Sequence, residues 1–247
     1  MSLPLRADNG FTAGYLSFME PQTFEAALVR SAFEIAALRG WPAVSVAGAA
    51  RAAGLELARA RLRFPMRAAI LTTFGRMADQ AALTGVSMSD TPRDRLFDML
   101  MRRIDVHQAD RAGVIAVLDH ARANPLLALF LSLSAENSMA WMLDGAGIDI
   151  GGLRGMIRVQ GLVAVWLTTL RAWSRDTSDD LPKTMAALDE GLRRAERAAA
   201  WLDGGRDTKT PPLEPDQPSP AADGTSSTDY DGDVFDDGGS PEPAPPH

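Results

Sequence analysis

Apolar residues recur at helical spacing from Thr23 to Leu202, and this continuous periodicity limits what the chain can fold into. No run alternates apolar and polar residues between hairpin turns, as a strand would. Alanine and leucine dominate the stretch, and both favour helix. Glycine, proline and capping residues divide it into expected helices near 23–39, 45–53, 56–63, 66–83, 92–107, 109–122, 125–144, 152–175 and 181–202. The sequence therefore predicts an all-α fold.

Two helical domains are expected within this stretch. Thr91-Pro92 joins a good N-cap to a proline that suits the first helical position, so it marks the start of a second domain. We expect a small helix-turn-helix domain at 22–85 and a larger helical domain at 90–202. Residues 1–21 carry scattered glycine and proline and are expected to form an irregular arm.

The acidic charge of the chain is concentrated in its last 45 residues. Residues 203–247 hold eleven Asp and Glu but two basic residues, a net charge of -9, whereas the whole chain carries -7. The rest is therefore weakly basic, at +2. Because large apolar groups are nearly absent, we predict a disordered acidic tail at 203–247. The few apolar residues of this tail are Tyr230, Val234 and Phe235, which belong either to a solvated tail or to a short docking motif. The acidic residues either stay solvated or compete with DNA phosphate for the basic domain.

Several classes of protein are excluded or disfavoured by composition. Cysteine is absent, which excludes disulfides, thiol nucleophiles and cysteine metal sites and is consistent with a reducing compartment. The start of the chain does not show the pattern of a signal peptide. The most apolar run, Val159 to Leu170, is shorter than the about 20 residues that span a bilayer. We expect a soluble cytoplasmic protein without integral membrane insertion.

No pattern in the sequence points to an enzyme. His107, His120 and His247 show no metal-ligand spacing. There is no GxSxG nucleophile elbow, phosphate loop or GxGxxG dinucleotide motif. We therefore expect no catalytic residues, no metal and no cofactor.

Residues 44–64, VSVAGAARAAGLELARARLRF, have the pattern of a capped helix, a glycine turn and a second short helix. Ser45 can cap the first helix, and Gly54 can take the left-handed conformation of the turn. The inner face is expected to consist of Val46, Ala49, Ala50, Leu55 and Leu62.

Arginines gather on the second of these short helices. Between Phe24 and Leu71 seven Arg face three Glu, a local charge of +4. Arg59 and Arg63 lie on the second helix, with Arg61 and Arg67 nearby. A basic helix after a tight turn can enter the major groove, where arginine contacts phosphate or guanine. A plain helical hairpin with surface arginines gives the same pattern, so this observation alone leaves both interpretations open.

The stretch from Ala27 to Leu71 resembles the DNA-binding domain of TetR-family transcriptional regulators. The residues that carry the resemblance are Gly40, Ser45-Val46, Ala52-Ala53-Gly54-Leu55, Phe64-Pro65 and Ile70-Leu71. The chain departs from the family in having Arg61 for the usual Tyr, Arg67 for Lys and Ala58 for Gly. The resemblance implies a homodimeric regulator that binds double-stranded DNA at a palindromic operator. The residues expected to contact DNA are Ser45, Glu56, Arg59, Arg61, Arg63 and Arg67.

The second half of the chain also resembles the C-terminal region of Coq-nine-type ubiquinone-biosynthesis proteins, which share the TetR fold. The segments are TPRDRLFDMLMRRID, SMAWMLDGAGID and LRAWSRDTSDDLPKTMAALDEGLRR. The match rests mainly on Arg95, Arg103, Trp141, Asp176, Ser178, Asp180, Thr184 and Leu188-Asp189. This resemblance implies an alternative function, a lipid-binding accessory protein whose DNA-binding module is vestigial.

Large, adaptable side chains in the second domain suggest a small-ligand site. Methionine and tryptophan can line a cavity for an apolar or lipid-like ligand, although plain core is the commoner role. Arg158 either binds an acidic head group or pairs with a carboxylate such as Asp144 or Glu136. The residues expected at the ligand site are Met139, Trp141, Met142, Met156, Arg158 and Trp166.

The expected helix at 152–175 is apolar on almost all sides, so more than one face must be covered. A second subunit would cover it. In the TetR family the last two long helices form a four-helix dimer interface, and the resemblance places a homodimer interface at 152–202.

Overall fold

The computed structural model describes residues 20–204, and every regular element in this range is helical. The helices are α2 (Pro21–Arg39), α3 (Val46–Ala52), α4 (Leu57–Arg63), α5 (Ala68–Leu83), α6 (Pro92–Ala109), α7 (Arg111–Ala123), α8 (Pro125–Gly145), α9 (Gly152–Trp173) and α10 (Pro182–Gly204), with a short 3-10 helix η1 (Trp41–Ala43) after α2. The expected all-α fold is confirmed, and each expected helix is present within about three residues of its bounds. The irregular arm, apart from its last two residues, and the acidic tail with Tyr230, Val234 and Phe235 lie outside the described range.

Local capping explains where the helices of the second half begin. The Thr91 hydroxyl accepts from Asp94 N–H at 3.2 Å, and the Asn124 side chain accepts from Leu127 N–H at 3.0 Å. A proline follows each cap at the first helical position, as at the start of α6 and α8. These short-range contacts satisfy backbone groups that no helix can pair at its own end.

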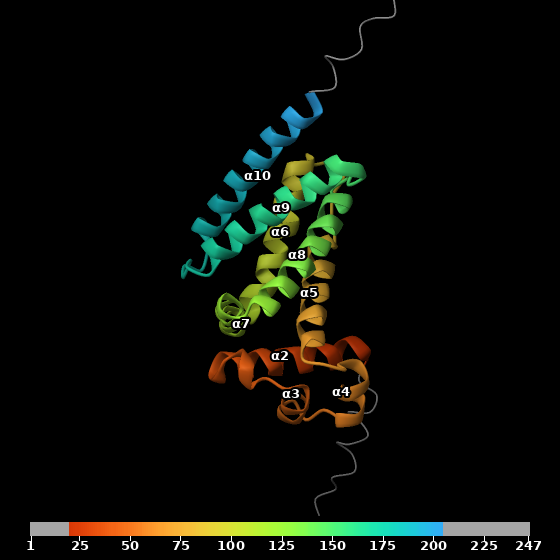
Figure 1. The fold of residues 1–247 in the computed structure, drawn as a ribbon, viewed down its shortest axis with the longest axis vertical. Helices are drawn as coiled ribbons and strands as arrows, with labels where there is room; N and C mark the ends of the chain where they lie inside the picture. Colours follow the sequence, from red (N-terminus) through yellow and green to blue (C-terminus); the bar gives the residue numbers. More distant parts are fainter. Residues whose placement is uncertain (1–19, 205–247) are drawn as a thin grey trace, which may run out of the picture. The chain divides into compact units, whose positions relative to one another are not determined.

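Helix α2 packs on both the short helices and the rest of the fold (Figure 1). It contacts α3 and η1 on one side and α5 and α7 on the other. Helix α5 then leads from the short helices to α6 and α8. Gly113 of α7 makes the contact with α2 close, because a Cβ there would lie 2.4 Å from the Phe33 carbonyl oxygen. Helix α2 is therefore held in place by α5 and α7.

A chain of aromatic rings joins the core of the first helices to that of the last. The Phe33 ring lies 4.5 Å from the Phe74 ring, and Phe74 lies 5.0 Å from the ring of His107. His107 in turn contacts Trp166 edge-on at 5.4 Å and Trp173 at 6.1 Å. The described residues thus share one continuous hydrophobic core. The domain boundary that the sequence suggests between residues 85 and 90 remains a prediction.

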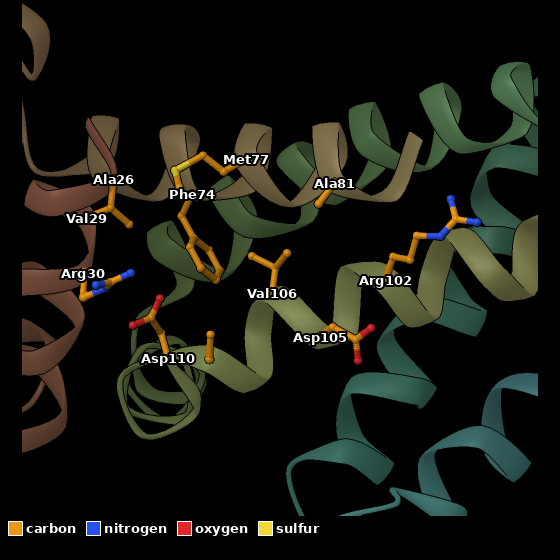
Figure 2. Close-up of a pocket in the computed structure, with 11 residues that line it drawn as sticks. Ala26, Val29, Arg30, Phe74, Met77, Ala81, Arg102, Asp105, Val106 and Asp110 are labelled. Atoms are coloured by element: carbon orange, nitrogen blue, oxygen red, sulfur yellow. The ribbon is translucent and has the colours of Figure 1, made fainter. Parts of the chain in front are cut away.

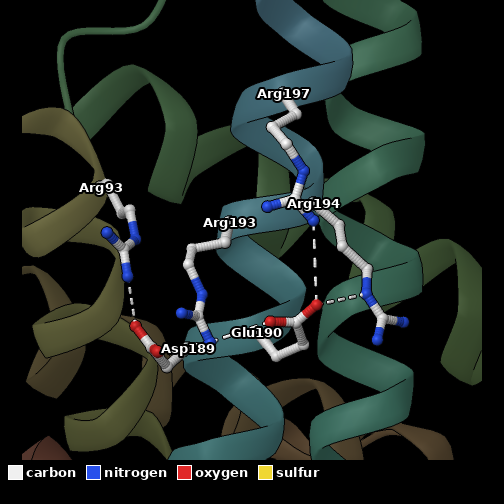
Figure 3. Close-up of polar contacts among 6 residues, drawn as sticks. All are labelled: Arg93, Asp189, Glu190, Arg193, Arg194 and Arg197. Carbon is white, nitrogen blue, oxygen red and sulfur yellow. Dashed lines mark hydrogen bonds and ion pairs between the residues drawn. The ribbon is translucent and has the colours of Figure 1, made fainter.

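The last two helices, α9 and α10, pack along each other (Figure 1). Gly191 permits the close approach, since a Cβ there would lie 2.9 Å from a Val165 methyl group. On its other side α10 contacts α6, where Arg93 forms an ion pair with Asp189 (Figure 3). Further ion pairs run along α10, and Glu190 accepts from Arg194 at 2.8 Å.

One described helix, α8, is long and apolar enough by length and composition to cross a bilayer. A core helix of a soluble protein passes the same test. The inner side of α8 is core, with Met139 and Met142 fully buried. The side chain of Glu136 within α8 accepts a hydrogen bond from Gln160 of α9 at 2.8 Å. A single such helix is therefore weak evidence for a membrane span.

Candidate nucleic-acid interface

The corner between α3 and α4 is fixed by its own backbone. Gly54 adopts a φ of 67°, the left-handed region that favours glycine. Gly54 N–H then donates to the Arg51 carbonyl at 3.1 Å, and Leu55 N–H donates to the Ala50 carbonyl at 2.8 Å. These two bonds satisfy carbonyls left open at the end of α3. The expected glycine corner is confirmed.

The inner side of α4 is set by Leu55, Ala60 and Phe64, all buried. The prediction that Leu62 also faces inward is wrong, because Leu62 is 81% exposed. Successive helical residues are turned by about 100°, so a residue two positions after Ala60 points to nearly the opposite side. The outer face of α4 consists of Ala58, Arg61 and Leu62, all exposed.

Two of the expected DNA-contacting arginines also hold α4 to α2. The Arg59 guanidinium lies 4.5 Å from the centre of the Phe24 ring. Arg63 lies 3.6 Å from a Glu25 carboxylate oxygen, and Arg76 of α5 donates to the other oxygen of that carboxylate at 2.9 Å. Both arginines therefore have a structural role that sequence reasoning did not identify, in addition to any contact with DNA.

Arg61 is exposed on the outer face of α4, and its guanidinium donates to the carbonyl of Pro65. Arg67 is exposed at the start of α5 and lies 5.5 Å from the Trp41 ring. It also donates weakly to the carbonyls of Trp41 and Pro42 at 3.4 and 3.3 Å. These contacts order both cations close to the surface, where a phosphate can reach them.

Ser45 and Glu56 occupy the N-cap positions of α3 and α4. The exposed Ser45 hydroxyl accepts from Gly48 N–H at 3.0 Å, which leaves its proton available for a phosphate oxygen. Glu56 is exposed and makes no capping bond. Of the six expected DNA-binding residues, five are exposed and Arg59 is half-buried. Their contact with DNA remains a prediction.

The six residues expected at the ligand site separate into two groups. Met139, Met142 and Trp166 lie in the hydrophobic core. Trp141 is 57% exposed and Met156 is 55% exposed. Met156 lines an open groove of about 380 Å³ between α8 and α9, together with Leu133, Ile150 and Val159 among others. The structure therefore does not gather these residues around one enclosed cavity, and their role in ligand binding stays a prediction.

Arg158 lies near the start of α9 and donates to the Asp149 carbonyl at 2.8 Å. Glu136, one of the two carboxylates considered for it, accepts instead from Gln160. A backbone carbonyl is thus one partner of Arg158, and its pairing with a carboxylate or with a ligand head group remains a prediction.

A buried ion pair occupies the centre of the larger helices. Arg103 of α6 pairs with Asp79 of α5, and the Ser138 hydroxyl donates to the same carboxylate at 2.8 Å. The Arg103 guanidinium also lies 5.1 Å from the Trp166 ring. Burial lowers the pKa of Arg103 to about 10, so it is still charged at neutral pH. This pair ties α5, α6 and α8 together.

Several residues that carry the Coq-nine-type resemblance have visible structural roles. The buried Asp176 carboxylate accepts from the Thr184 amide and hydroxyl at 3.0 Å and from the Ser178 hydroxyl at 2.5 Å. These bonds lower the pKa of Asp176 to about 2, and they fix the corner between α9 and α10. Arg95 donates to the Ala146 carbonyl at 3.0 Å, beyond the end of α8. These residues of the shared pattern therefore help to fix the fold.

Solved structures of TetR regulators share this fold. The TetR transcriptional regulator from Nitrosomonas europaea matches with a TM-score of 0.54 and 20% identity, over 71% of this chain and 99% of its own. A TetR-family regulator from Streptomyces coelicolor matches with a TM-score of 0.52 and 16% identity, over 76% and 86%. One from Rhodococcus sp. matches with a TM-score of 0.51 and 15% identity, over 70% and 98%. No protein-family model and no curated protein matches the sequence.

The chain has the TetR fold, so the fold expected from the resemblance is confirmed. The matches cover nearly the full length of two of these regulators. At these identities the likeness establishes the fold, and function depends on the residues of this chain.

Proposed function

We propose that the protein is a homodimeric transcriptional regulator that binds double-stranded DNA through α3 and α4. The observation that carries the proposal is the outer face of α4, which projects Arg61 and Leu62 away from the core. Arginine can contact guanine or phosphate, and an exposed leucine can contact a thymine methyl group. Ser45 and Arg67 lie at the starts of the flanking helices, where they would add phosphate contacts.

The proposed dimer uses the exposed side of α9 together with α10. Leu153, Met156, Ile157 and Leu167 are all between 42% and 69% exposed along α9. Trp201, near the end of α10, is 81% exposed. Such a concentration of exposed apolar residues on paired helices favours contact with a second copy of the chain. A two-fold dimer would present two copies of α4 to successive major grooves, about 34 Å apart.

A duplex selected from random DNA provides the test of DNA binding. We expect it to contain a palindrome, and its affinity to fall steeply with salt because arginines displace counterions from phosphate. Arg61→Ala should weaken binding by about 1–3 kcal/mol if Arg61 reads a base. Arg122→Ala is the matched control, since Arg122 is an exposed arginine of α7 paired with Asp119. If both variants bind like the wild type, α4 is not the reading helix.

Sedimentation analysis tests the dimer separately. Leu167→Glu places a charge within the proposed interface and is expected to yield monomers with much weaker operator binding. Leu126→Glu on α8 changes a leucine of greater exposure, 70% against 50%, outside that interface and should remain dimeric. A dimer that persists in Leu167→Glu would contradict the assignment to α9 and α10.

We also propose that a small apolar or amphipathic ligand controls the regulator. Binding would favour one of two dimer geometries, which differ in the spacing of their DNA-binding helices. The close packing of α2 on α5 and α7 supports this, because a shift in the larger helices must be transmitted to the first helix of the DNA-binding module. The measurement is operator affinity with and without ligand.

A further inference from the structure

A cavity of about 500 Å³ lies between α2, α5 and α6 (Figure 2). Its wall is mainly apolar and includes Val29 from α2, Phe74 and Met77 from α5, and Val106 from α6. Its volume falls within the range of about 300–1,000 Å³ that is typical of small-molecule sites. None of the six residues expected at the ligand site lines this cavity.

Charged side chains lie at the two ends of the cavity, as Figure 2 shows. Arg102 is already engaged, since it donates to the carbonyls of Ala82 and Thr84 at 3.1 and 2.6 Å. Arg30 is exposed to solvent on α2. Asp105 is exposed on α6, beside Arg102.

The Asp110 carboxylate is the least satisfied of these groups. It is half-buried, and within residues 20–204 it makes no hydrogen bond or ion pair. Burial raises the pKa of Asp110, Arg30 of α2, which lies on the same side of the cavity in Figure 2, lowers it, and Glu34 of α2 raises it by a smaller amount. A carboxylate in this position has lost part of its hydration without gaining a partner, so a cation that reached it would recover that loss.

We propose that this cavity binds a small amphipathic cation, with its apolar body against Phe74 and Met77 and its ammonium group on the Asp110 carboxylate. An ammonium would form a charge-assisted hydrogen bond there and could also approach the face of the Phe74 ring. An anion has less to gain, because Arg102 is engaged and Arg30 is exposed and already interacts with the charge of Asp110. The ligand class is thus set by one unpaired acid beside an apolar wall.

The position of the cavity also gives the ligand a route to the DNA-binding helices. Its walls come from the first helix of the DNA-binding module, from the connecting helix α5 and from the first helix of the larger domain. A ligand between them would hold α2 at one distance from α6, and this consequence rests on the proposed function. We infer that the bound cation changes operator affinity by favouring one arrangement of α2.

Calorimetric titration of the full chain at pH 7.5 tests the site itself. The probes are 4-phenylbutylamine and its uncharged and anionic counterparts, 4-phenylbutanol and 4-phenylbutyrate. We expect the amine to bind at least tenfold more tightly than either counterpart. Asp110→Asn should remove that preference, and Ala81→Phe should abolish binding by filling the cavity, which Ala81 lines. Asp144→Asn, an exposed carboxylate at the end of α8, is the control and should bind like the wild type.

Equal affinity for the amine and the alcohol, or an unchanged preference in Asp110→Asn, would overturn the site. Tightest binding of the butyrate would overturn the assignment to a cation. The operator experiment is read separately. If the amine binds through Asp110 and leaves operator affinity unchanged, the site stands and the regulatory consequence is refuted. If the protein binds no duplex at all, the proposed function fails while the titration still decides the site.

Discussion

His107 is expected to make the fold sensitive to mild acid. Its imidazole is buried among Phe74, Trp166 and Trp173, and its Nδ1–H donates to the Arg103 carbonyl at 2.7 Å. Burial, and secondarily the positive charge of Arg103, lower the pKa of His107 from 6.5 to about 3. The ring therefore stays neutral in the folded protein throughout the range where an exposed histidine gains a proton.

The sign of the effect follows from where the proton binds. In the unfolded chain His107 takes up a proton below about pH 6.5, and in the folded protein it does so near pH 3. Its contribution to the free energy of unfolding is therefore complete above pH 6.5 and is lost as the pH falls through this interval. Going from pH 7 to pH 5 costs about 2 kcal/mol at this residue, or roughly 4–8 °C in Tm for a domain of this size.

Urea unfolding at pH 7 and pH 5, followed by circular dichroism, measures this cost. His107→Phe keeps an aromatic ring in the site but cannot gain a proton, and subtracting its pH dependence from that of the wild type removes the contribution of all other groups. We expect the difference to be about 2 kcal/mol. Equal pH dependence in both proteins would refute the reasoning. An NMR titration of the wild-type ring, which should stay neutral to pH 5, is the second measurement if the variant folds poorly.

Three further outcomes are expected. Gly113→Ala should destabilise the fold by about 1–3 kcal/mol in urea unfolding, because its Cβ would meet the Phe33 carbonyl at 2.4 Å; an unchanged midpoint would contradict the close contact. Ser45→Asp should keep the cap, and so the stability, yet weaken duplex binding by repelling phosphate, whereas Ser45→Ala should lose about 1 kcal/mol of stability. Equal duplex binding by Ser45→Asp and wild type would count against a phosphate contact. Deleting residues 207–247 removes ten Asp and Glu with one Lys and so changes the net charge from -7 to +2. Association with DNA should therefore accelerate at low salt, and the gain should shrink as salt rises; a rate that does not change would refute this electrostatic argument.

The helix pattern was predictable because its signals are local. A cap such as Thr91 or Asn124 accepts a hydrogen bond from an amide three residues away, and Gly54 permits its turn because glycine can adopt a positive φ. None of these contacts depends on a distant part of the chain. The 3-10 helix at Trp41–Ala43 was missed, since glycine and proline there indicated only an interruption.

The orientation of α4 was not predictable in the same way. A helix of seven residues makes only about two turns, so its apolar pattern fits more than one inner face. The choice is made by contacts with α2, where Arg59 lies on Phe24 and Arg63 pairs with Glu25. Those contacts direct Leu62 outward, and no spacing within α4 contains that information.

The candidate ligand site could not be predicted from the sequence either. Large apolar residues such as Met139 of α8 and Trp166 of α9 belong to the core because neighbouring helices cover them. The cavity instead appears where α2 meets the later helices α5 and α6, and a half-buried carboxylate distinguishes it from ordinary core. Whether a side chain lines a cavity or fills the core depends on what faces it, which the pattern of a single helix does not record.

The junction of α2 with the later helices explains why a cavity there would matter more than one elsewhere. Phe33 of α2 packs on Phe74 of α5, and α2 also lies against the backbone at Gly113 of α7. Because a packed core resists deformation, α2 cannot shift without sliding over both helices. The cavity is a place along this contact where α2 faces open volume, so a change there meets less resistance. A ligand in that space would act directly on α2, which packs against the proposed DNA-binding helices, without first rearranging the buried pair of Arg103 and Asp79.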